Sequence, residues 1–90
     1  MKFEWDASKA ASNLRKHGVS FQEGASVFGD PMALTFDDPD HSIGESRFLA
    51  FGITKTGKFV IVSYTGAAGV IRIISVRVMS KRERNIYEDG

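Results

Sequence analysis

Residues 70–87 read VIRIISVRVMSKRERNIY, a run of β-branched residues followed directly by a helix-start signal. Val70–Val78 is apolar on both alternating faces, which predicts an interior strand covered on each side. A side-chain period of two predicts that Arg72 and Arg77 point to opposite faces. Ser80–Glu83 fits the capping box that opens a helix. An arginine-bearing strand feeding a basic helix suits a polyanion, although strand arginines are also common as solvated rim residues.

The first third of the chain predicts one short strand and two helices. Lys2–Trp5 alternates polar and apolar residues. Asp6 can cap a helix over Ala7–His17, whose basic end suits the helix dipole. A second capping box at Ser20–Glu23 opens another helix, which ends at Gly29–Pro31.

The remainder predicts a run of strands. Met32–Phe36, Arg47–Thr54 and Lys58–Thr65 are strand-like, with a tight hairpin between the last two. Residues 66–69, Gly-Ala-Ala-Gly, connect to the strand at 70–78. The order β-α-α-β-β-β-β-α predicts a single α+β domain over residues 1–90, with helices on one face of a mostly antiparallel sheet.

Composition and charge narrow the functional classes. The 90 residues contain no cysteine, which excludes disulfides and thiolate metal sites. The chain has no apolar run of membrane-spanning length and its start lacks a signal-peptide core, so we expect a cytoplasmic protein. Residues 1–45 hold four basic and eight acidic side chains, whereas residues 46–90 hold eight and three. The basic half indicates nucleic acid or an acidic partner, unless the two halves neutralise each other.

Few motifs carry chemistry of their own. The Gly57–Lys58 pair lacks the remaining residues of a phosphate-binding loop, and the acidic run at 37–40 lacks calcium-loop spacing. His17, at a helix end, is expected to cap or pack. His41 precedes Glu45 and Arg47, a set that suits acid–base chemistry beside a phosphate contact, or an ion-paired turn.

Taken in order, these segments resemble the BrnT family, the toxins of the BrnT–BrnA type II toxin–antitoxin systems. The resemblance runs through Phe3–Asp6, Lys16–Phe21, Asp30–Pro31, Ile71–Ser75 and Glu83–Arg84. It implies a fold similar to that of RelE-type ribonucleases. It also implies a metal-independent ribonuclease that inhibits translation and is neutralised by a BrnA-like antitoxin with a ribbon-helix-helix domain. The protein would then meet DNA only through the antitoxin complex, and no membrane.

An RNA-cleaving site assigns roles to specific side chains. Arg72 and Arg77 are expected to stabilise charge on the phosphate, although opposite orientations would let only one reach it. His41 or Glu45 would transfer protons, with neither metal nor cofactor. Three further side chains are expected to bind RNA: Arg47 and Lys81 on its backbone, and Tyr64 by stacking a base, if it is not packed in the core.

Two departures from the family pattern concern phosphate contacts. Residues 66–69 stand where the resemblance implies an arginine, and Val78 stands where it implies a lysine. An alternative function is therefore a binding module with little catalysis, which docks the antitoxin and modulates its DNA binding.

Overall fold

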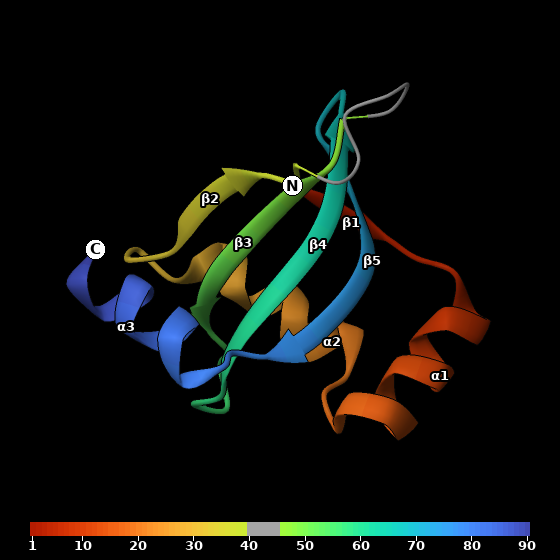
Figure 1. The fold of residues 1–90 in the computed structure, drawn as a ribbon. Coiled ribbons are helices and arrows are strands. Elements are labelled where there is room, and N and C mark those ends of the chain that lie inside the picture. Colours follow the sequence, from red (N-terminus) through yellow and green to blue (C-terminus); the bar gives the residue numbers. More distant parts are fainter. Residues whose placement is uncertain (40–45) are drawn as a thin grey trace.

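The computed structural model describes residues 1–39 and 46–90, which form a five-stranded mixed sheet with helices on both sides (Figure 1). The predicted α+β class and element order are confirmed. The strands are β1 (Lys2–Glu4), β2 (Leu34–Asp37), β3 (Phe48–Ile53), β4 (Phe59–Ala67) and β5 (Val70–Val78). The helices are α1 (Ala7–His17), α2 (Phe21–Ala25), the 3₁₀ turn η1 (Ser26–Gly29) and α3 (Lys81–Asp89).

The strands lie in the order β1-β5-β4-β3-β2, so β5 is an interior strand, as its sequence predicts. β1 pairs with β5 in parallel, and the other three pairings are antiparallel. The turn between β4 and β5 is shorter than predicted, since β4 continues to Ala67. Only Ala68 and Gly69 lie between the two strands, and both have positive φ, 54° and 79°, as tight hairpin turns require.

A β-bulge in β5 corrects the predicted orientation of its arginines. Ser75 pairs with Ser63, but Tyr64 pairs with Ile73, so Ile74 is an extra residue in the ladder. Arg77 and Arg72 stand opposite Ile61 and Thr65, which lie four residues apart in β4 and therefore share a face. The prediction of opposite faces was wrong, because the five residue steps from Arg72 to Arg77 along β5 match only four steps along β4.

The first face of the sheet is covered by α1, α2 and η1. Its core contains Val19, Phe21 and Val27 from that layer, packed against residues of β3, β4 and β5. Gly24 allows α2 to approach β5 closely, since a Cβ there would lie 2.5 Å from a methyl group of Val76.

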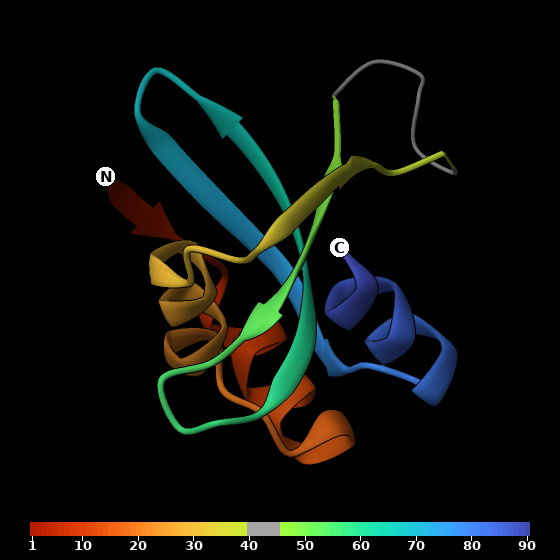
Figure 2. The same ribbon diagram turned by 90° about the vertical axis from the view of Figure 1, so that its left-hand side faces the viewer.

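The second face of the sheet is covered in part by α3, so the prediction that all helices share one face was wrong. Tyr87 of α3 and Met79 form a second apolar cluster with Phe51 and Ile61. Figure 2 shows α3 across the sheet from α1 and α2. The reason is that β5 ends beside apolar side chains of β3 and β4 on this face, which the apolar side of α3 then buries.

Asn13 completes the hydrogen bonding of β5 beyond the end of β1. β1 pairs with residues 70–72 only, and Val76 lies farther along the same side of β5. The buried Asn13 amide donates to the Val76 carbonyl at 2.8 Å and accepts from the Val76 N–H at 3.1 Å. It also donates to the Val19 carbonyl at 3.1 Å, so one side chain joins α1, the following loop and the sheet.

Candidate RNA-binding face

Among the described residues, the part of the second face that α3 does not cover carries a polar strip along β4 and β5. We call it the open strip and define it by the side chains of Ser63, Thr65, Arg72, Ser75 and Arg77, which the ladder register places on one face. Serine and threonine at these positions interrupt an otherwise apolar pair of strands. The open strip thus joins both arginines of β5 on a face that carries hydroxyl groups.

A recess of about 290 Å³ lies in the middle of the second face, and we call it the central recess. Its polar lining consists of Asp38, Arg47, Ser63, Ser75 and Arg77, over a floor of Leu49, Ile61 and Ile74. The Asp38 N–H donates to the Arg47 carbonyl at 2.9 Å, which continues the β2–β3 ladder and brings both residues to the recess. Ser63 and Ser75 are direct cross-strand partners beneath them.

Arg77 is held by a carboxylate from the first turn of α3. Its Nη1 and Nη2 donate to Glu83 Oε1 and Oε2, each at 2.7 Å. Glu83 Oε1 also accepts the Ser80 N–H at 2.8 Å in the predicted capping box. The hydrogen bonds from Arg77, together with those from Ser80, lower the pKa of the Glu83 carboxyl group to about 2. A guanidinium has five N–H donors, and the Glu83 pair uses two of those on Arg77.

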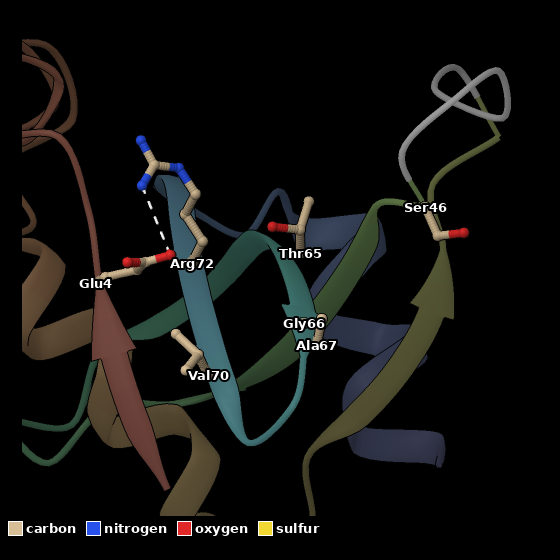
Figure 3. Close-up of a pocket in the computed structure, with 7 residues that line it drawn as sticks. All are labelled: Glu4, Ser46, Thr65, Gly66, Ala67, Val70 and Arg72. Carbon is tan, nitrogen blue, oxygen red and sulfur yellow. Dashed lines mark ion pairs between the residues drawn. The ribbon is translucent and has the colours of Figure 1, made fainter.

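A second recess, of about 530 Å³, lies at the other end of the open strip, and we call it the edge recess (Figure 3). It is lined by Glu4, Ser46, Thr65, Gly66, Ala67, Val70 and Arg72. Arg72 Nη1 lies 3.7 Å from Glu4 Oε1, and both side chains are about half exposed, at 47% and 54%. This ion pair is therefore looser and wetter than that of Arg77.

The charges around the two recesses come from different parts of the fold. The three middle strands, β3 to β5, lie within residues 46–82, a stretch without a carboxylate. The acidic groups at the recesses come from β1 (Glu4) and from the end of β2 (Asp38), and Glu83 reaches Arg77 from α3. The middle strands thus present cations and hydroxyl groups, which suits contact with phosphates.

The structure brings some of the predicted site residues close together. Arg47 and Arg77 line the central recess, and Arg72 lies on the same face. Lys81 is the exposed first residue of α3. Tyr64 instead lies on the first face, with ring centroids 4.9 Å from Phe28 and 5.6 Å from Phe48, away from the arginines.

The proposed proton-transfer residues His41 and Glu45 lie outside the described residues. Three polar residues of the central recess, Asp38, Ser63 and Ser75, were not predicted as site residues. Ser75 could have been predicted from the sequence, because it is a small polar residue within a β-branched run and lies two residues before Arg77. Asp38 was read only as part of an acidic turn, because its place beside Arg77 depends on the β2–β3 pairing.

The described residues, 1–39 and 46–90, contain no group of three or more histidine, aspartate or glutamate side chains placed to hold a metal ion. No helix among them is both long enough and apolar enough to cross a bilayer.

The sequence matches one family model, and the fold is similar to that of a solved structure. A family model described as "Ribonuclease toxin, BrnT, of type II toxin-antitoxin system" matches residues 5–83. The crystal structure of the Brucella abortus ribonuclease toxin BrnT is similar, with a TM-score of 0.69 and 24% sequence identity over 90% of this chain and 99% of that chain. At this identity the likeness establishes a shared fold. No curated protein matches the chain.

Proposed function

The chain belongs to the BrnT family of ribonuclease toxins of type II toxin–antitoxin systems, and from this we propose that it is an endoribonuclease whose site is the open strip and the central recess. The bulge at Ile74 carries the proposal, because it puts Arg72 and Arg77 on the same face of the sheet. Arg47, Ser63 and Ser75 gather beside Arg77, so cations and hydroxyl donors converge where a phosphate would bind.

In the proposed reaction the RNA supplies its own nucleophile. The 2′-hydroxyl gives its proton to a base, O2′ bonds to phosphorus, the P–O5′ bond breaks, and O5′ takes a proton from an acid. Arg77 and Arg47 would stabilise the charge on the phosphate, with Arg77 oriented by Glu83. We keep His41 and Glu45 as the proposed acid and base, and Lys81 as a contact to the RNA backbone. None of these steps calls for a metal or a cofactor.

The biological setting follows from the family. A type II toxin implies an RNA target and an antitoxin partner. We propose that RNA cleavage inhibits translation in the cytoplasm and that the antitoxin is BrnA-like, with a ribbon-helix-helix domain. DNA contact would belong to the toxin–antitoxin complex.

The Arg77–Glu83 pair favours a second candidate function. The carboxylate already occupies the Nη1/Nη2 edge of this guanidinium, one of the edges at which arginine binds a phosphate bidentately. If the remaining donors do not suffice, the protein is a binding module with weak catalysis that docks the antitoxin and modulates its DNA binding.

We expect expression of the wild-type protein without an antitoxin to arrest growth and degrade RNA. Colony formation, RNA integrity and incorporation of a labelled amino acid after induction measure this. Arg77→Ala should restore most of the growth. Arg15→Ala, an equal loss of charge at an exposed site on α1, is the matched control and should remain toxic. Normal growth with soluble wild-type protein would support the binding module.

Cleavage by the purified protein should persist in excess EDTA. The expected reason is that arginines and the RNA's own hydroxyl supply the charge stabilisation and the nucleophile. Gel analysis of a labelled RNA with and without chelator tests this, with a magnesium-dependent nuclease as the control. Activity that EDTA removes and a divalent ion restores would contradict the proposed mechanism.

A further inference from the structure

We propose that the edge recess is a second RNA subsite, which binds a phosphate farther along the same RNA strand than the one at the central recess. The inference rests on the proposed ribonuclease function and assigns Arg72 to substrate binding rather than to the chemical step. Its starting point is the contrast between the two arginines of β5, which share a face but differ in their partners.

Arg72 keeps its hydrogen-bond donors for a ligand. Its contact to Glu4, at 3.7 Å, is longer than a hydrogen bond, whereas Arg77 makes two bonds of 2.7 Å to Glu83. Among the described residues, Arg72 has no hydrogen bond to a protein acceptor. A loose, half-exposed ion pair is weak, so a phosphate can replace Glu4 at little cost.

The rest of the edge recess suits a ribonucleotide. Figure 3 shows the Thr65 hydroxyl oxygen on the side of its strand that faces Arg72. Ala67 and Val70 are direct cross-strand partners and form a floor of short apolar side chains. The recess thus offers the exposed Arg72 guanidinium to a phosphate, with the largely buried Thr65 hydroxyl beneath it, beside an apolar floor for the sugar or base.

The distance between the recesses fits one continuous strand. Arg72 and Arg77 are separated by four ladder steps, about 13 Å at the usual rise along a strand. A nucleic-acid strand covers that span in about two to four nucleotides, since its stacked form rises about 3.4 Å per nucleotide and unstacked forms rise more. Both recesses also lie on the same face of the sheet. This continuity favours RNA over a protein partner as the occupant.

The first test compares substrates of two lengths. A labelled 12-nucleotide RNA of mixed sequence is cleaved with the wild type to map the scissile bond, and a trinucleotide spanning that bond is then prepared. Arg72→Ala should lower kcat/KM for the 12-mer about tenfold through KM, as expected for one lost charged hydrogen bond. Cleavage of the trinucleotide, which is too short to reach the edge recess, should fall much less than that of the 12-mer. Arg15→Ala on α1 is the charge-matched control and should alter neither.

The second test measures binding without cleavage, so it separates failure of the subsite from failure of the ribonuclease function. The probe is the DNA version of the same 12-mer, which lacks the 2′-hydroxyl nucleophile, followed by fluorescence anisotropy at several salt concentrations. Arg72→Ala should reduce the slope of log K against log salt by about 0.7, the value for one phosphate contact in single strands. Arg72→Lys should keep that slope, and Ala67→Arg, which adds a cation to the recess, should increase it.

Three results would overturn the subsite. Equal losses of kcat on the 12-mer and the trinucleotide would place Arg72 in the chemical step. Unchanged cleavage and an unchanged salt slope in Arg72→Ala would show that the recess does not hold RNA. Unchanged RNA binding together with weaker binding of a co-expressed antitoxin would make the recess a protein-docking site.

Discussion

At the scale of single residues, the two arginines of β5 differ in how firmly a carboxylate holds the guanidinium, and this difference suits them to different roles. Both lie on the open strip and both meet a carboxylate. Arg77 is fixed by Glu83 through two short bonds, so its orientation is set before any ligand arrives. Arg72 is only loosely held by Glu4. Arg77 thus suits a step that needs a fixed geometry, and Arg72 suits adaptable binding.

We expect Arg77→Ala to lower RNA cleavage tenfold to a hundredfold and to destabilise the fold by about 1 kcal/mol. The first effect is the usual cost of a lost charged hydrogen bond. The second is the upper range for a part-exposed ion pair, because the Arg77 side chain is 44% exposed. Cleavage kinetics and urea unfolding of Arg77→Ala measure the two effects, with Arg15→Ala as the control. A loss of stability with full activity would show that Arg77 only anchors α3.

At the scale of elements, α3 is attached to the body of the protein near both of its ends. At its start, Glu83 joins Arg77 of β5. Near its end, the Tyr87 hydroxyl donates to Asp30 Oδ2 at 2.6 Å, and Asp30 also accepts the N–H groups of Met32 and Ile53. Burial and the Asp30 carboxylate raise the Tyr87 pKa to about 12, so the hydroxyl keeps its proton and its donor role at neutral pH.

Tyr87→Phe should cost about 1.5–3 kcal/mol and loosen α3 more than the rest of the molecule. It removes a hydrogen bond to a charged carboxylate in a part-buried place, while the ring contact with Phe59 remains. Thermal unfolding and amide hydrogen exchange in α3 report the change. Tyr64→Phe is the matched control, since no hydrogen bond of that hydroxyl is found among the described residues. Equal exchange rates in α3 of Tyr87→Phe and wild type would contradict this attachment.

At the scale of the whole molecule, the described residues of the acidic first half and the basic second half form ion pairs with each other at a few points. Glu23 contacts Lys58 at 3.1 Å, and Glu4 lies near Arg72. The pairs Arg77–Glu83 and Arg84–Glu88 lie within the second half. The neutralisation within the monomer that the sequence left open therefore exists at a few points, and both recesses still contain arginine.

Stability should fall as the pH drops from about 4.5 to about 2. The pKa of Glu23 is lowered to about 2, first by the Thr56 hydroxyl and then by the Ser20 N–H and Lys58, and that of Glu83 is lowered to about 2 chiefly by Arg77. Carboxyl groups with an ordinary pKa near 4.5 bind protons in the unfolded chain first, so their stabilisation is complete above that pH and is lost below it. Urea midpoints across this range measure the loss. Glu23→Gln and Glu83→Gln should each flatten the dependence.

The local part of the fold could be predicted from the sequence, and the site only in part. The bounds of α1 and β5 follow from nearby signals, since Asp6 caps one and β-branched residues fill the other. The bulge at Ile74 could not be predicted, because a ladder step is skipped only in relation to β4. The capping role of Glu83 was predicted, but its bonds to Arg77 were not, because they depend on how the chain turns between β5 and α3. The position of Asp38 in the same recess as Arg77 could not be predicted either, because it depends on the order of the strands in the sheet.

Asn13 also protects the protein from unwanted association. A strand whose N–H and C=O groups face outward is a template on which another chain can add, and such edges lead to domain swapping and aggregation. Where β1 ends, β5 would present such an edge at Val76, but the Asn13 amide occupies both of its backbone groups. A side chain therefore takes the place of a neighbouring strand, and the sheet is closed to intermolecular extension at that point without the chain having to supply a longer β1.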